Sequence, residues 1–99
     1  SGSGPAYVFF LVEQFVHAAK SLGFDDETAQ LLVSETFLGA SELLIASGKE
    51  PSELRRQVTS PNGTTERAIA KMNEAGLAKL FEEATAAAVA RAKEIAAGN

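Results

Sequence analysis

Apolar residues recur with a helical period along almost the whole chain. In the first segment, which Pro5 opens and Gly23 stops, they fall every three or four residues, at Val8, Leu11, Val12, Phe15, Ala18, Ala19 and Leu22. Pro5 suits the first turn of a helix, because the N–H that proline lacks would have no partner there. No segment alternates between apolar and polar residues as a half-buried strand does. The pattern therefore predicts an all-α protein.

The remaining pattern predicts about five helices in a single domain over residues 1–99. Each later helix is bounded by a capping residue, a proline or a glycine: from Asp25 or Asp26 to Gly48, from Pro51 to about Gln57, from the end of a polar loop to Gly76, and from about Leu77 to Ala97.

The first helix is apolar on every side. Tyr7, Val8, Phe9, Phe10, Leu11 and Val12 are consecutive, whereas a helix on the surface of a bundle needs only one apolar stripe. The chain is too short to wrap such a helix completely, so a second copy of the chain is the expected cover. The alternative is an unusually well-buried helix in a monomer.

Composition narrows the classes of partner and compartment. The net charge is -4 and no lysine or arginine cluster occurs, which argues against nucleic acid and anionic membranes as partners. The longest apolar run, residues 6–12, is far shorter than the roughly 20 residues that span a bilayer. The chain has no cysteine, which favours a reducing compartment such as the cytoplasm. It begins at Ser1 rather than methionine, so we expect a fragment of a longer protein, and its opening SGSG also fits an engineered linker.

Few side chains suggest chemistry of their own. His17 is the only histidine and has polar helical neighbours, so we interpret it as part of a solvated face. Glu82 and Glu83 are explained by solubility, and no metal site is expected. The stretch GSGP at residues 2–5 lacks a preceding strand and a third glycine, so it is not a dinucleotide-binding motif.

The loop VTSPNGTTERAI, residues 58–69, is the one segment that suggests a binding site. Asn62 and Gly63 tolerate left-handed backbone angles, which can turn successive N–H groups into one concavity that attracts an anion. Thr64 and Thr65 come at the expected start of a helix, where free N–H groups add to the attraction. Their hydroxyls can bind a ligand or simply cap the helix, and the sequence leaves both interpretations open.

Three phrases resemble the C-terminal dimerisation domain of pyrroline-5-carboxylate reductase. They cover nearly the whole chain in the family's order: SGSGPAY at 1–7, FLGASELLIASGKEPSELRRQVTSPNGTT at 37–65 and NEAGLAKLFEEATAAAVARAKEI at 73–95. The resemblance makes SGSG part of the protein rather than a linker. It implies a helical domain intertwined with a second subunit, in enzymes that form homodimers and often decamers.

The same resemblance implies a reaction and a set of site residues. The parent enzyme reduces Δ1-pyrroline-5-carboxylate to L-proline with NADPH or NADH, bound mainly by an N-terminal Rossmann domain absent from this chain. This segment alone is then expected to be inactive and to bind no cofactor. The family's substrate loop falls on Ser60, Gly63, Thr64 and Thr65, with the Thr65 hydroxyl reaching the ring nitrogen as the catalytic contact. Ser3 and Gly4 are weaker candidates for cofactor contacts.

Two positions depart from the family pattern. Asn62 stands where many members have a second glycine, and Glu66 stands where an apolar residue is common, so its carboxylate could repel an anionic substrate. Two other functions remain open: a non-catalytic helical homodimerisation module, and the equivalent domain of a reductase for another imino or keto acid.

Overall fold

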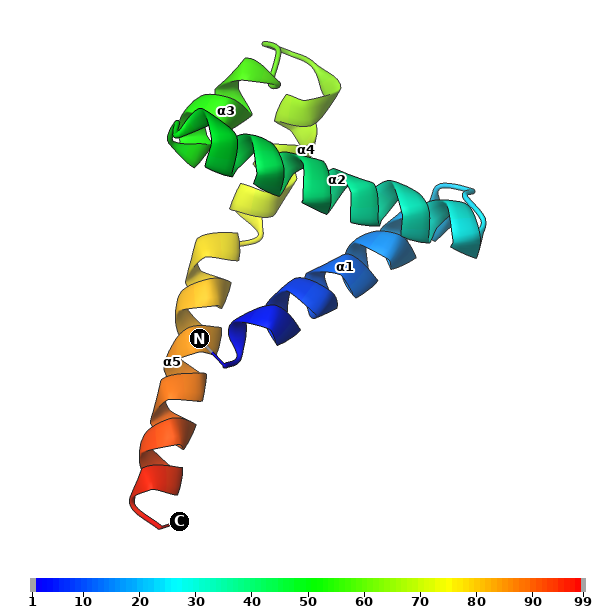
Figure 1. Ribbon diagram of the computed structural model, residues 1–99. Coiled ribbons are helices and arrows are strands. Elements are labelled where there is room, and N and C mark those ends of the chain that lie inside the picture. Colours follow the sequence, from blue (N-terminus) through cyan, green and yellow to red (C-terminus); the bar gives the residue numbers. More distant parts are fainter. Residues whose placement is uncertain (1, 99) are drawn as a thin grey trace. The chain divides into compact units, whose positions relative to one another are not determined.

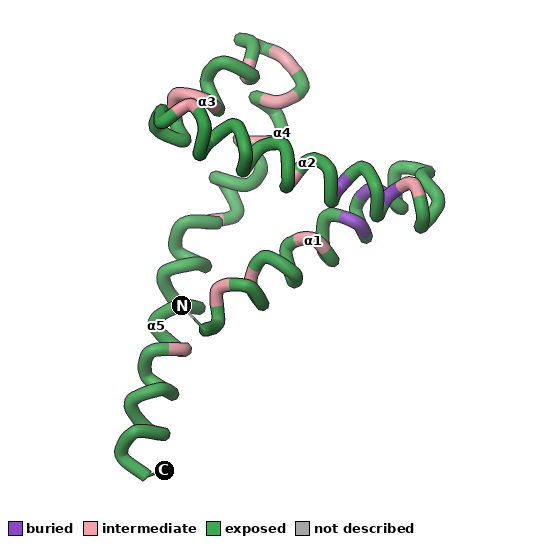
Figure 2. The backbone as a smooth tube through the Cα atoms, in the orientation of Figure 1, coloured by how far each residue is buried: buried purple, intermediate pink, exposed green. Residues whose placement is uncertain are grey.

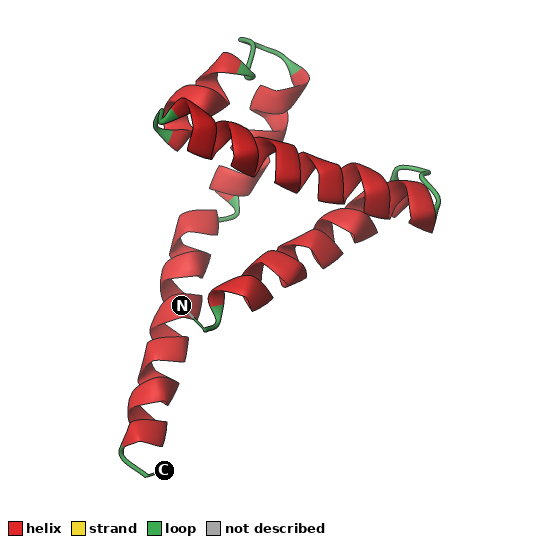
Figure 3. Ribbon diagram, in the orientation of Figure 1, coloured by secondary structure: helices red, strands yellow, loops and turns green. Residues whose placement is uncertain are grey.

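The structure is a computed structural model that describes residues 2–98, so Ser1 and Asn99 lie outside the account that follows. All regular secondary structure in the described range is helical (Figures 1 and 3). The elements are α1 (Gly4–Ser21), α2 (Asp26–Ser47), α3 (Pro51–Gln57), α4 (Thr64–Glu74) and α5 (Leu77–Ala96). The predicted all-α class and its five helices are confirmed, with boundaries close to those expected from caps, prolines and glycines.

The start of α2 shows which of two aspartates is the cap. Asp25 has an extended backbone, and its carboxylate accepts a hydrogen bond of 2.8 Å from the backbone N–H of Thr28. Hydrogen bonds from Thr28 stabilise the ionised carboxylate and lower the pKa of Asp25 below its ordinary value of 3.8. Asp26 is instead the first helical residue, and its carboxylate lies 3.4 Å from the Lys20 ammonium of α1.

The chain forms two compact units, Ser1–Pro51 and Ser52–Asn99, each described here by itself. In the first, α1 and α2 form a hairpin whose core lies near the connecting turn (Figure 2). The buried residues are Val16 and Ala19 of α1 and Ala29 and Val33 of α2. Farther from the turn, the rings of Phe15 and Phe37 meet edge to face, with centroids 6.3 Å apart.

Most of the apolar surface of this hairpin is not covered. Phe9 and Phe10 of α1 are 67% and 60% exposed, and Ile45 of α2 is 83% exposed. Two helices can bury only the faces that they turn toward each other, so the apolar residues on their other sides need a further partner.

Among the described helices, α2 alone is long and apolar enough to cross a membrane by length and composition, with a mean hydropathy of 1.3. The sequence analysis counted only uninterrupted apolar residues and did not identify α2, because polar residues, including Glu35 and Glu42, interrupt its apolar stretches. A partly apolar helix face that lacks a cover is equally the property of a subunit interface.

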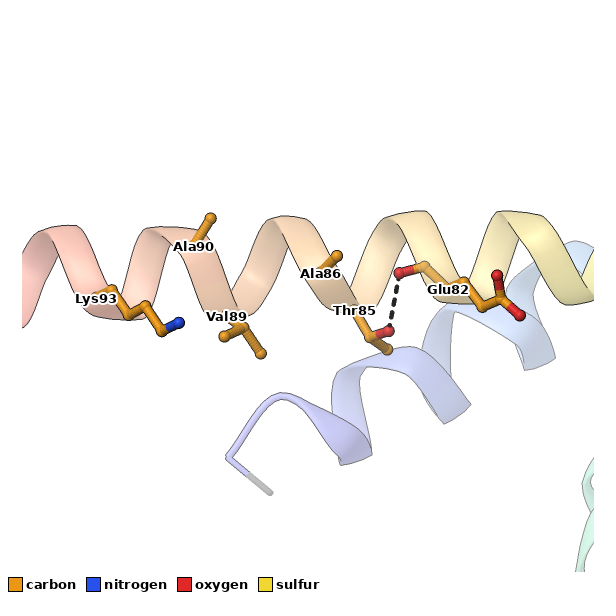
Figure 4. Close-up of a pocket in the computed structure, with 6 residues that line it drawn as sticks. All are labelled: Glu82, Thr85, Ala86, Val89, Ala90 and Lys93. Atoms are coloured by element: carbon orange, nitrogen blue, oxygen red, sulfur yellow. Dashed lines mark hydrogen bonds between the residues drawn. The ribbon is translucent and has the colours of Figure 1, made fainter.

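In the second unit, a loop joins α3 to α4, and Gly76 separates α4 from α5. Gly76 has a φ of 76°, a left-handed conformation that a residue with a Cβ adopts at a cost. No described residue of this unit is buried. On α5, Thr85, Val89 and Lys93 point to one side and form part of an open helix surface (Figure 4). Leu80 and Val89 are 61% and 53% exposed, so α5 also presents uncovered apolar surface.

Candidate functional site

The loop between α3 and α4 contains a tight turn over residues 60–63. The carbonyl oxygen of Ser60 accepts a hydrogen bond of 3.0 Å from the N–H of Gly63. Pro61 supplies the fixed φ of the second turn position, and Asn62 has a φ of 62° at the third. A proline followed by a left-handed residue, closed by this bond, is the arrangement of a type II turn. Asn62 thus adopts the left-handed angle that its residue type tolerates.

Gly63 does not adopt the left-handed angles that its residue type tolerates. It is extended, with φ -89° and ψ -177°, a conformation open to any residue. Glycine is favoured here by space: a Cβ would lie 3.2 Å from the Ser60 carbonyl oxygen and 3.4 Å from the Ser60 Cβ. Of the two residues that tolerate left-handed angles, Asn62 alone adopts one, and Gly63 permits the close approach of the chain to Ser60.

The first turn of α4 carries free hydrogen-bond donors. Gly63 is the N-cap residue and has no side chain with which to cap the helix. Within residues 2–98, the backbone N–H groups of Thr64, Thr65 and Glu66 have no acceptor, and Arg67 is the first to donate, to the Gly63 carbonyl at 3.4 Å. This end of α4 therefore presents three N–H groups and the positive end of the helix dipole.

The threonine hydroxyls at this helix end do not cap it. Neither Thr64 nor Thr65 makes a side-chain hydrogen bond with another described residue. The Thr65 side chain is half-buried, whereas Thr64 and Ser60 are exposed. The structure thus brings Ser60, Gly63, Thr64 and Thr65 together around one turn, and the capping bond of the simpler interpretation is absent from it.

Glu66 lies on the side of α4 that faces α3. It lines a cavity of about 330 Å³ together with Arg55 and Arg56 of α3, Thr59 of the loop and Ile69 of α4. Arg56 also pairs with Glu53 on its own helix. Two arginines and one glutamate therefore line the same cavity, next to the loop of the predicted anion site. Thr59 is a member of this group that the sequence analysis did not select.

The other sequence-derived candidates lie elsewhere. Ser3 and Gly4 are at the start of α1, in the first unit, which is described separately from the loop. Ser3 is exposed, and its carbonyl accepts bonds from the N–H groups of Ala6 and Tyr7. His17 is exposed on α1, as expected for a solvated face. Among the described residues, no three acidic or histidine side chains gather as a metal site would require.

Comparison with known proteins gives one consistent result. Residues 1–95 match the family described as pyrroline-5-carboxylate reductase dimerisation. The pyrroline-5-carboxylate reductase of Pseudomonas aeruginosa is 49% identical over 96 residues, which are 97% of this chain and 35% of that protein. Pyrroline-5-carboxylate reductase 2 of Bacillus subtilis is 44% identical over 84 residues, 85% of this chain and 29% of the relative.

Solved structures agree with the sequence relatives. A pyrroline-5-carboxylate reductase from Coxiella burnetii is 48% identical and superposes with a TM-score of 0.92, over 95% of this chain and 35% of its own. The Plasmodium falciparum pyrroline carboxylate reductase, solved with NADP bound, is 27% identical with a TM-score of 0.82, over 85% of this chain and 32% of its own.

The chain thus spans about a third of the length of the relatives that it matches. Self-association, predicted from the all-round apolar α1, is the property for which the matching family is described. The uncovered apolar surfaces of α1, α2 and α5 likewise require a partner to cover them. The chain therefore belongs to the pyrroline-5-carboxylate reductase dimerisation family.

Proposed function

We propose that this chain joins the subunits and holds the substrate in an enzyme that reduces Δ1-pyrroline-5-carboxylate to L-proline with NADPH or NADH. The observation that carries the proposal is the start of α4, where three backbone N–H groups and two threonine hydroxyls have no partner within the described residues. Such a helix end suits the carboxylate of a small anionic substrate.

In our proposal, the donors to the substrate carboxylate differ from those expected from the sequence. The N–H of Gly63 is already bonded to the Ser60 carbonyl, so it is not a donor to substrate. In our proposal the N–H groups of Thr64 and Thr65 and the Ser60 hydroxyl bind the carboxylate. The half-buried Thr65 hydroxyl donates to the ring nitrogen. This arrangement would orient the imine and stabilise charge that develops on it, without a strong base.

The hydride for this reduction is supplied by a nicotinamide cofactor. The described residues form helices only, so they contain no βαβ unit of the kind that binds a dinucleotide. The proposal therefore places cofactor binding mainly on a part of the reductase outside this segment, with Ser3 and Gly4 as the candidate contacts from this chain. The segment alone is then inactive, and saturable NADPH binding to it in calorimetry would contradict the assignment.

We further propose that the functional assembly is a homodimer with intertwined helices, and that dimers can build a decamer. In this assembly the partner would cover the exposed apolar faces of α1 and α2. The cytoplasm is the proposed compartment, on the ground that the chain has no cysteine.

A single backbone donor can be removed to test the carboxylate site. Thr64 is the first helical residue of α4, where proline is well tolerated, and the extended Gly63 before it is compatible with a following proline. In the complete reductase, Thr64→Pro should leave the melting temperature near the wild-type value. It should raise the KM for Δ1-pyrroline-5-carboxylate by about 10-fold or more, because a hydrogen bond to a charged group is lost.

Two controls show whether a change in KM comes from the lost backbone N–H and involves the substrate carboxylate. Thr64→Ala keeps the N–H and should change the KM much less. For 1-pyrroline, the same ring without the carboxylate, wild type and Thr64→Pro should have equal KM values. An unchanged KM for the carboxylated substrate in Thr64→Pro would contradict the carboxylate site and favour a module that only joins subunits.

A further inference from the structure

Thr59 ties the substrate loop to the end of α3. Its hydroxyl donates a hydrogen bond of 2.6 Å to the carbonyl oxygen of Arg55, and its N–H donates to the carbonyl of Arg56 at 3.2 Å. The Thr59 side chain is half-buried, whereas Val58 before it and residues 60–62 after it are exposed. Thr59 is thus the residue at which the loop is anchored to the helix before it.

The position of Thr59 links α3, the turn and α4. Its side chain lines the cavity that Arg55 and Arg56 share with Glu66 and Ile69 of α4. The next residue, Ser60, begins the tight turn that leads into the first turn of α4. The turn is closed by the bond from the Gly63 N–H to the Ser60 carbonyl. A shift at Thr59 would therefore move Ser60 relative to the free N–H groups of α4.

We propose that Thr59 is a positioning residue for the substrate loop. It makes no contact with substrate in this scheme, and its hydroxyl fixes the direction in which the chain leaves α3. This sets the distance between the Ser60 hydroxyl and the N–H groups of Thr64 and Thr65. The inference rests on the proposed function, because it concerns the same carboxylate site, and it adds a residue that precedes the SPNGTT loop.

The Arg55 carbonyl accepts a second bond, from the N–H of Val58 at 3.1 Å. Removing the Thr59 hydroxyl therefore leaves no unpaired carbonyl at the end of α3, and the main consequence is greater freedom of the loop entrance. Thr59→Val removes the hydroxyl at nearly constant volume, while Thr59→Ser retains it.

Thr36 on α2 provides a matched control, because its hydroxyl donates to the carbonyl four residues earlier, that of Leu32, at 2.7 Å. Thr36→Val deletes the same type of bond within the middle of a helix, remote in sequence from the loop. The two valine variants should therefore lose similar stability, and only one should change the loop.

The experiment uses the complete reductase and measures melting temperature, oligomeric state and the KM values for Δ1-pyrroline-5-carboxylate and NADPH. In Thr59→Val we expect the KM for the imine to rise about 3- to 10-fold, with the KM for NADPH unchanged. Thr59→Ser should restore the wild-type KM for the imine, and Thr36→Val should not alter it.

The outcomes separate this inference from the function on which it rests. If Thr64→Pro raises the KM for the imine while Thr59→Val behaves like Thr36→Val, the carboxylate site stands and the positioning role is refuted. If neither loop variant changes that KM, both proposals fail. Should Thr59→Val not fold, Thr59→Ser decides, since a raised KM in a stable protein that keeps the hydroxyl would contradict the proposal.

Discussion

Measurements on Thr65 can distinguish a helix cap from a substrate contact, because the two roles predict different effects of removing its hydroxyl. The structure shows no capping bond from its hydroxyl, so Thr65→Ala should change the free energy of unfolding by only about 0.5 kcal/mol or less. As a contact to the ring nitrogen, the hydroxyl should contribute about 1.5 to 3 kcal/mol in the transition state, so kcat/KM should fall about 10- to 150-fold.

Kinetics and thermal denaturation of the complete reductase check this prediction for Thr65. Thr65→Ser keeps the hydroxyl and should recover most of the activity. A Thr65→Ala enzyme that turns over at the wild-type rate but melts several degrees lower would show that the residue acts only on the helix.

Gly63 should be sensitive to size rather than to backbone angle. A Cβ at this position would press on the Ser60 carbonyl at 3.2 Å, so Gly63→Ala should displace the turn by a few tenths of an ångström. We expect a higher KM for the imine with little loss of stability, and a larger effect in Gly63→Val. Asn62→Gly is the matched control, since it relaxes the left-handed φ of 62° and should leave the KM unchanged. Equal KM values for Gly63→Ala and Asn62→Gly would contradict the spatial argument.

At the scale of the element, α2 depends on an ionised cap. The pKa of Asp25 is lower in the folded state than its ordinary value of 3.8. Its stabilising effect is therefore fully present above the unfolded pKa and is lost as the pH falls through the lower folded pKa. Asp25→Ala should lower the melting temperature at neutral pH, and the difference from wild type should shrink in acid.

A pH series of thermal melts checks the Asp25 prediction. Asp25→Asn retains an oxygen acceptor for the Thr28 N–H but does not ionise, so the acid-dependent part of the effect should be missing from it. If the wild type and Asp25→Ala differ by the same amount at every pH, the cap does not act through its charge.

For the whole molecule, the uncovered apolar helices predict an obligate assembly. We expect a dimer or larger species at micromolar concentration, with well over about 1,200 Å² buried between subunits. Phe10 is 60% exposed in the single chain. Phe10→Asp should unfold the protein rather than release a folded monomer, because a chain with so few buried residues depends on its partner for stability. Sedimentation equilibrium provides the measurement, and a single folded species of 10.4 kDa would contradict the prediction.

The sequence by itself determined the class of fold and the location of the loop. Helix bounds follow largely from local chemistry, since Pro51 opens α3 and Gly76 interrupts the chain between α4 and α5. The choice of Asp25 over Asp26 as the cap of α2 came from the structure. The sequence also indicated that the chain needs a partner, because six consecutive apolar residues cannot all face one side of a helix. The loop at residues 58–69 was selected as a candidate site by its turn formers and by its resemblance to a family.

Only the tertiary structure decided how the loop is built. Sequence indicated that both Asn62 and Gly63 tolerate left-handed angles, but the type II turn observed needs one such residue, and the close approach to Ser60 explains the glycine at the other position. The choice between a capping and a free hydroxyl at Thr65, the direction of Glu66 toward α3, and the bond from Thr59 to Arg55 all depend on distances across the loop. Residue types restrict the local conformations available, whereas these contacts depend on how α3, the turn and α4 follow one another in space.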